Sequence, residues 1–187
     1  MSVFGRIKNL FFSCAAQITQ APEDRPLFRV IRERKVRRIV EIGVGTGHRA
    51  VKILEAAARN RLSEPVQYTG IDLFEARTDR STGLSVKEAY RKLKPTKANV
   101  RLVPGDPQNA LASVANSLIG TELLIISFDQ QGDALARAWF YVPRLLTAES
   151  VIFEELPDPK SGELTLHPLT RLEVESRATK ARPRRAA

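Results

Sequence analysis

From Val36 to Leu156 the sequence alternates between strand-like and helical segments, and this alternation restricts the fold more than any other feature. Runs rich in β-branched and other apolar residues predict strands. Segments with apolar residues at helical spacing lie between them. Strands separated by helices of this length indicate βαβ units. We therefore predict a doubly wound α/β fold whose mostly parallel sheet carries helices on both faces. The predicted strands are residues 36–43, 66–74, 99–106, 122–129 and 150–156, and the predicted helices are 48–62, 85–94, 107–118 and 132–146.

The two ends of the chain lie outside this alternation. Residues 1–35 contain two helical segments, which we expect to pack on the core; the first is amphipathic, so binding at a membrane surface is the rival interpretation. After the last strand, residues 162–167 and 170–175 predict a C-terminal antiparallel hairpin. The expected organisation is N-terminal helices over 1–35, a ligand-binding domain over 36–176 and a basic, disordered tail over 177–187.

The net charge of +9 is concentrated at these two ends. Residues 1–40 carry +6 and residues 171–187 carry +4, whereas the residues between them carry −1. Basic clusters attract polyanions, but a terminal basic run is more often solvated, and no aromatic-rich RNA-binding signature accompanies this one. Nucleic acid is therefore a second choice of partner, after a small molecule.

Cysteine usage and hydropathy bound the class of protein. Cys14 is the single cysteine, which excludes an intramolecular disulfide and the usual cysteine-rich metal sites. This usage is typical of a reducing compartment, so we expect a cytoplasmic protein. No segment predicts a transmembrane helix, and the apolar block near the N-terminus is too short for a secretory signal. Nothing in the sequence indicates an oligomeric state.

Three glycines at alternate positions, Gly43, Gly45 and Gly47, follow the first predicted strand in the stretch EIGVGTG. Glycine costs ordering entropy and contributes no side-chain packing. A turn without a ligand is the alternative, but in a doubly wound fold the ligand crevice lies at the carboxyl ends of the strands, where this turn falls. We therefore expect a ligand to approach the backbone here.

The spacing of these glycines argues against NAD. The dinucleotide fingerprint G-x-G-x-x-G would place its third glycine at position 48, which is histidine. Glu41, at the end of the same strand, would repel a pyrophosphate but could orient a cationic ammonium group. The turn and the carboxylate together favour a ligand with an amino-acid part.

With these residues in view, the sequence resembles the class I S-adenosylmethionine-dependent methyltransferases, and within them the small O-methyltransferases, over about residues 36–156. EIGVGTG is similar to the family's first motif, whose glycines lie along the methionine part of the cofactor. In GIDLF, the resemblance implies that Asp72 accepts hydrogen bonds from both ribose hydroxyls, with Leu73 beside it. It also implies a Rossmann-like fold, S-adenosylmethionine as cofactor and S-adenosylhomocysteine as product.

Two further segments extend the resemblance. VPGDPQNAL is similar to the region in which Asp106 and Pro107 would face the adenine; Asp106 could equally cap the following helix, with Pro107 in its first turn. The strand ending in ISFD would place Asp129 opposite the transferred methyl group, although Asp129 could instead cap the helix that follows. Asp129 is the candidate catalytic base. Arg77 and Arg80 would suit an acidic acceptor, although loop arginines usually hold no ligand.

The last part of the resemblance departs from the family. The metal-dependent O-methyltransferases normally have a glycine-rich turn before the fifth strand and Asp-Asn or Asp-Asp at its end, where this chain has TAES and Glu154-Glu155. Asp129 with Glu154 or Glu155 could form an oxygen site for Mg²⁺, but no third ligand is apparent. We therefore do not expect a metal.

Three functions remain after these steps. The first is an S-adenosylmethionine-dependent methyltransferase acting on a small molecule at oxygen, which we prefer. The second is an RNA methyltransferase, which the basic ends support. The third is a non-catalytic binding module of the same fold, which the departures near the fifth strand support.

Overall fold

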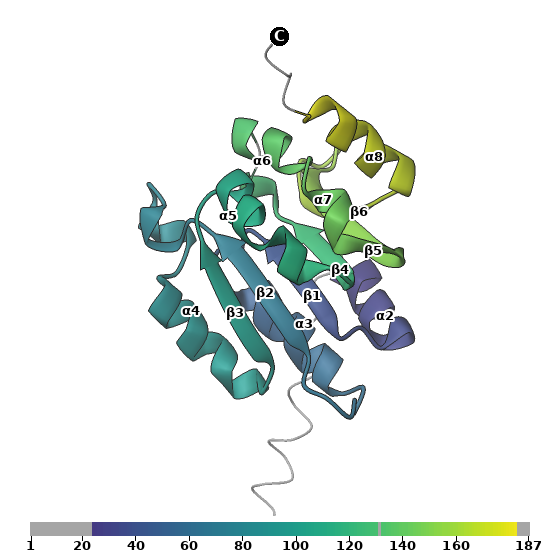
Figure 1. Ribbon diagram of the computed structural model, residues 1–187. Coiled ribbons are helices and arrows are strands. Elements are labelled where there is room, and N and C mark those ends of the chain that lie inside the picture. Colours follow the sequence, from purple (N-terminus) through teal and green to yellow (C-terminus); the bar gives the residue numbers. More distant parts are fainter. Residues whose placement is uncertain (1–23, 131, 183–187) are drawn as a thin grey trace, which may run out of the picture.

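The computed structural model describes residues 24–130 and 132–182 (Figure 1). Six strands form one sheet in the order β3-β2-β1-β4-β5-β6. β1 to β5 run parallel to their neighbours, and β6 is antiparallel to β5. This confirms the predicted doubly wound, mostly parallel sheet with a C-terminal antiparallel hairpin. The strands are β1 (Arg38–Ile42), β2 (Gln67–Asp72), β3 (Asn99–Pro104), β4 (Thr121–Ile126), β5 (Leu146–Pro157) and β6 (Leu164–Leu169).

Helices cover both faces of this sheet, with α5 and α3 on opposite sides (Figure 1). The predicted helix over 132–146 is divided into α6 and α7, which are separated by Trp139–Tyr141. The first predicted N-terminal helix lies outside the described residues, and the second is α2. In the described part of the chain, none of the helices is long and apolar enough to cross a membrane. The α-helices are α2 (Arg25–Arg34), α3 (His48–Ala58), α4 (Val86–Leu93), α5 (Pro107–Val114), α6 (Asp133–Ala138), α7 (Val142–Leu145) and α8 (Arg171–Lys180).

The core has one main layer on each face of the sheet. Val40 and Leu124 point into the layer beneath α5 to α8, whereas Ile39, Leu123 and Ile125 point into the layer beneath α2 and α3. Successive strand residues therefore alternate between two buried faces. This is why the central strands are almost continuously apolar in sequence.

The C-terminal segment differs from the prediction. The hairpin consists of β5 and β6, whereas residues 171–175, expected as a strand, begin α8. A capping box starts this helix: the Glu173 backbone N–H donates to Thr170 Oγ1 at 3.3 Å, and Glu173 Oε2 accepts from the Thr170 N–H at 2.7 Å. Residues 177–180, expected in a disordered tail, are the last residues of the same helix.

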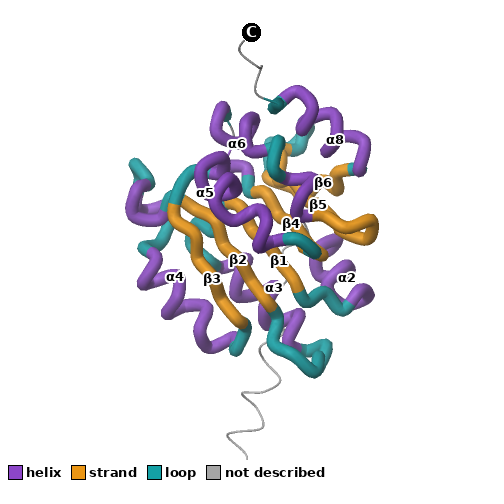
Figure 2. The backbone as a smooth tube through the Cα atoms, viewed as in Figure 1, coloured by secondary structure: helices purple, strands orange, loops and turns teal. Residues whose placement is uncertain are grey.

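The topology fixes where a ligand crevice would lie. From β1 the chain proceeds to β2 and β3 on one side of the sheet, and it then crosses to β4 and β5 on the other side. Figure 2 shows these strands side by side, with loops at their ends. The loops that follow β1 and β4 therefore diverge at a topological switch point, which is where open α/β sheets bind ligands.

Candidate functional site

The glycine turn after β1 occupies this switch point. Gly43, Gly45 and Gly47 have φ values of +93°, +52° and +70°, a region that glycine enters at little cost. A Cβ atom on Gly43 would lie 2.7 Å from Ser127 Cβ and 2.8 Å from Asp129 Oδ1. Glycine is thus required here by the backbone conformation and by the close approach of the segment after β4.

Asp72 lies at the end of β2 and is 1% exposed. Its Oδ2 atom accepts from the Gly45 backbone N–H at 2.8 Å, and its Oδ1 atom accepts from the Phe74 N–H at 3.0 Å. Arg77 Nε donates to Oδ1 and Arg77 Nη2 donates to Oδ2, both at 2.6 Å. Burial alone would raise the pKa of Asp72, but these four hydrogen bonds hold it below its usual value. The carboxylate is fully partnered by the protein.

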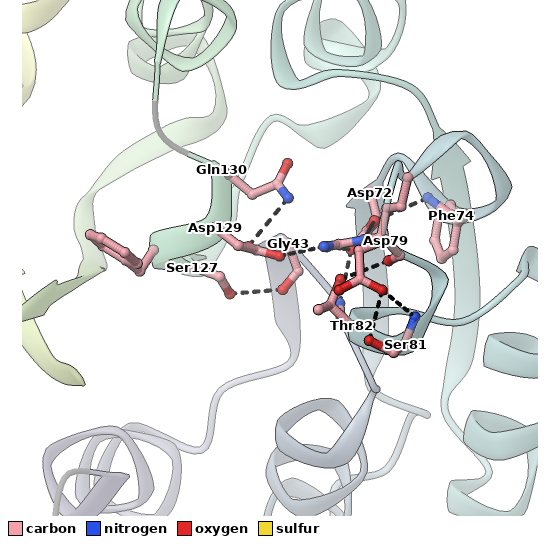
Figure 3. A network of polar contacts seen from close by, with 12 residues as sticks. Gly43, Asp72, Phe74, Asp79, Ser81, Thr82, Ser127, Asp129 and Gln130 are labelled. Carbon is pink, nitrogen blue, oxygen red and sulfur yellow. Dashed lines mark hydrogen bonds and ion pairs between the residues drawn. The ribbon is translucent and has the colours of Figure 1, made fainter. Parts of the chain in front are cut away.

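Arg77 links the ends of two strands that are distant in sequence. Besides Asp72, it contacts Asp129 after β4, with 2.6 Å between Arg77 Nη1 and Asp129 Oδ2. Figure 3 shows Asp72 and Asp129 on opposite sides of this network, with Gly43 between the strands that carry them. The Arg77 side chain is 8% exposed, so it is not the solvent-facing loop arginine that the sequence suggested. The hydrogen bond to Asp72 raises the pKa of Arg77.

Asp129 lies in the 3-10 turn η7 (Phe128–Gln130), and its side chain is 41% exposed. The cap residue of α6 is Gly132, so the alternative that Asp129 caps this helix is wrong. Ser127 lies two residues before Asp129, and the Ser127 hydroxyl donates to the Gly43 carbonyl at 2.7 Å. Asp129 therefore combines a position beside the glycine turn with access to solvent.

Glu41 belongs to a second network beneath the turn. Its carboxylate is 1% exposed and accepts from the Tyr68 hydroxyl at 2.5 Å. Burial raises the pKa of Glu41 to about 7, although Arg49 and Tyr68 act in the opposite direction. Arg49, on α3, pairs with Glu155 and donates to Ser127 Oγ at 3.1 Å. Glu41 is thus a core residue, and its role toward a ligand's ammonium group stays a prediction.

Asp106 caps α5, as one of the two sequence interpretations had it. Its Oδ1 atom accepts from the backbone N–H groups of Gln108 at 3.0 Å and Asn109 at 3.1 Å. Pro107 occupies the first turn of the helix and is buried. The preceding turn touches the site, since the Gly105 N–H donates to the Asp72 carbonyl at 2.9 Å. The roles of Asp106 and Pro107 toward an adenine remain predictions, as does that of the half-buried Leu73.

The three acidic residues considered for Mg²⁺ pair with three different arginines. Asp129 pairs with Arg77, and the other two pairs are Glu154 with Arg177 at 2.8 Å and Glu155 with Arg49. Among the described residues, no group of three or more potential ligand side chains is placed to hold a metal ion. Each of these three carboxylates therefore has an arginine as a charged partner.

Sequence reasoning missed Tyr68 and Arg49. Tyr68 pairs with Ile39 in the β1–β2 register, and strand alternation places Ile39 and Glu41 on one face. The β1–β2 register would thus have been enough to predict the Tyr68–Glu41 contact, but the sequence alone does not give that register. Arg49 carried no such signal, because its partners Ser127 and Glu155, which lie after β4 and within β5, are distant in sequence.

Solved structures of other proteins share the fold of this chain. The sequence matches no protein-family model and no curated protein. The O-methyltransferase TomG from Streptomyces achromogenes, involved in tomaymycin synthesis and solved in complex with S-adenosylmethionine (SAM), is similar over 92% of this chain and 71% of its own, with a TM-score of 0.53 and 15% identity. A TehB-like SAM-dependent methyltransferase from Corynebacterium glutamicum is similar over 94% of this chain and 80% of its own, with a TM-score of 0.51 and 14% identity. The chain therefore has the Rossmann-like fold of the SAM-dependent methyltransferases.

Proposed function

We propose that this protein is a SAM-dependent methyltransferase that transfers a methyl group to an oxygen of a small-molecule acceptor. One observation carries the proposal: a side-chain-free turn at the end of β1 lies against a carboxylate at the end of β2, with 2.8 Å between Gly45 N and Asp72 Oδ2. This pair lies at the switch point of the sheet. The likeness to TomG, which was solved with SAM, supports the choice of cofactor.

The residues around the turn fit this cofactor on one condition. Gly43, Gly45 and Gly47 offer bare backbone for the methionine part, and an ionised Asp72 suits the two hydroxyl donors of a ribose. In this structure the Gly45 and Phe74 N–H groups occupy two of the acceptor positions of Asp72, and Arg77 occupies the remaining two. A ribose can therefore reach the carboxylate only when Arg77 moves away.

When bound, SAM supplies a methyl group already activated by a sulfonium, so the chain must mainly position an acceptor and exclude water. Asp129 is the candidate to receive the proton of an acceptor hydroxyl, because its carboxylate lies beside the turn and is partly exposed. Arg77 holds one of its oxygens in this structure, so proton transfer would also depend on where Arg77 goes.

A non-catalytic binding module is the second candidate. It is favoured by the fact that Arg77 engages both Asp72, which we assign to the ribose, and Asp129, the candidate base. Such a module would bind SAM or S-adenosylhomocysteine without turnover on any acceptor.

Titration calorimetry with SAM, S-adenosylhomocysteine and NAD tests the proposal. We expect the first two to bind and NAD not to bind, and we expect Asp72→Ala to abolish binding. Asp158→Ala is the matched control, since this half-buried carboxylate serves a local turn between β5 and β6. Binding that survives Asp72→Ala, or a preference for NAD, would contradict the assignment. Methyl transfer from labelled SAM to a panel of hydroxylated acceptors then separates an enzyme from a binding module.

A further inference from the structure

We propose that Arg77 is a built-in competitor of the cofactor: its guanidinium occupies the sugar-binding side of Asp72, and the cofactor binds by exchanging with it. This inference rests on the proposed function, because the competing ligand is the ribose of SAM. It assigns to the loop after β2 control over access to the site.

Asp72 has a limited hydrogen-bonding capacity. A carboxylate has about four acceptor positions. The Gly45 and Phe74 N–H groups take two of them, and both belong to backbone turns that hold the site in shape. Arg77 takes the other two with its Nε and Nη2 atoms. A ribose diol also presents two donors, so it competes with the guanidinium for the same two positions.

Arg77 has another carboxylate within reach. Its Nη1 atom already lies 2.6 Å from Asp129, whose side chain is 41% exposed. A guanidinium that leaves Asp72 can therefore keep a charged partner at the edge of the site, where solvent also reaches it. This reduces the cost of the exchange, because the arginine is not left buried and unpaired.

The loop that carries Arg77 also approaches the glycine turn. A Cβ atom on Gly83 would lie 2.5 Å from Arg77 Cδ, and one on Gly45 would lie 3.4 Å from the Thr82 carbonyl oxygen. Figure 3 draws Asp79, Ser81 and Thr82 in the same polar network as Asp72. Asp79 accepts from the Ser81 N–H at 2.8 Å, and its carbonyl accepts from Thr82 Oγ1 at 2.9 Å. Both hydrogen bonds join residues of the same segment, and we expect this segment to shift together with Arg77.

The expected effect follows from the fraction of molecules in which Asp72 is available. The apparent dissociation constant equals the intrinsic constant divided by that fraction. If Arg77 is on Asp72 in roughly nine of ten molecules, its removal tightens cofactor binding about tenfold.

Two variants test this by titration calorimetry with S-adenosylhomocysteine. Arg77→Gln removes the competing charge. Gly83→Ala keeps the charge but places a methyl group where the Arg77 side chain now packs, and the Gly83 φ of −151° suits any residue. Arg59→Gln, on an exposed arginine at the end of α3, is the matched control. Circular dichroism and thermal unfolding first establish that each variant is folded.

We expect about tenfold tighter binding for Arg77→Gln and Gly83→Ala than for the wild type, with Arg59→Gln unchanged. If the wild type binds and both variants bind equally or more weakly, Arg77 organises the site and the exchange is refuted, while the proposed function stands. If Arg77→Gln does not fold, the affinity of Gly83→Ala decides in the same way. If neither the wild type nor any folded variant binds, the proposed function itself is refuted.

Discussion

Replacing Glu41 by glutamine is expected to flatten the pH dependence of the unfolding free energy between about pH 4.5 and pH 7. Glu41 is 1% exposed, and burial raises its pKa from 4.5 to about 7 in the folded protein. Within this interval the folded protein keeps the proton that the unfolded chain has released. A group of this kind makes the unfolding free energy fall as the pH rises, until the folded carboxyl has also ionised.

The magnitude follows from the size of the pKa difference. Each pH unit over which the two states differ by one proton changes the free energy by about 1.4 kcal/mol. The interval from 4.5 to about 7 therefore corresponds to a loss of about 3 kcal/mol. Glutamine has a similar volume and can still accept a hydrogen bond from the Tyr68 hydroxyl, so the variant keeps the packing but lacks the titration.

Urea unfolding at several pH values between 4.5 and 7.5 measures the effect. Glu41→Gln should lose the downward slope that the wild type shows, and it should be the more stable of the two above pH 7. Glu55→Gln, on an exposed position of α3, controls for the loss of one carboxylate and should keep the wild-type slope. Parallel curves for the wild type and Glu41→Gln would show that Glu41 ionises as readily in the fold as in the unfolded chain, which refutes the reasoning.

Three further substitutions test the packing around the site and α8 by urea or thermal unfolding. Gly43→Ala should destabilise by about 1–3 kcal/mol more than Gly105→Ala, because both glycines have positive φ but a Cβ atom meets close neighbours at the first position alone; equal losses would rule out crowding. Thr170→Ala should cost about 1 kcal/mol through loss of the capping box, and an unchanged midpoint would contradict that role. Arg177→Ala should lower the unfolding free energy by about 1–3 kcal/mol, because it leaves the buried Glu154 without its arginine. Adding Glu154→Gln should recover part of this loss, and no recovery would show that the ion pair contributes nothing.

The sheet could be predicted because its buried strands have a distinct apolar pattern in the sequence. Strands covered on both faces must be apolar at nearly every position, and the segment 123–126 shows this directly. The segment 170–175 was misread because its alternating Leu-Glu-Val-Glu fits a short strand. The stretch also contains the T-x-x-E capping box, formed by Thr170 and Glu173, which decides for a helix.

The position of the candidate site on the sheet could be predicted from the sequence, but its internal pairing could not. Gly43 and Asp72 lie at the ends of β1 and β2 as predicted, because glycine spacing and strand ends are local signals, and their roles toward a cofactor stay predictions. The pairing of Asp72 with Arg77 depends on the path of a loop without periodicity, and the pairing of Arg77 with Asp129 depends on a contact between segments about fifty residues apart. Composition and spacing carry no information about either contact.

The two arginines beside the glycine turn should differ in what they control. Arg77 pairs with the partly exposed Asp129, whereas the Glu155 carboxylate that pairs with Arg49 is 11% exposed and the nearby Glu41 lies in the core. A ligand can rearrange the network of Arg77 without opening the core. Rearranging the network of Arg49 would require the core to open. Arg49→Gln should therefore lower the unfolding free energy while leaving the affinity of the folded molecules for S-adenosylhomocysteine within about twofold, in contrast to Arg77→Gln, because removing one partner of a buried ion pair costs mainly stability. Denaturation and calorimetry on the same samples separate the two effects, and an affinity change in Arg49→Gln as large as that in Arg77→Gln would show that the two networks act as one.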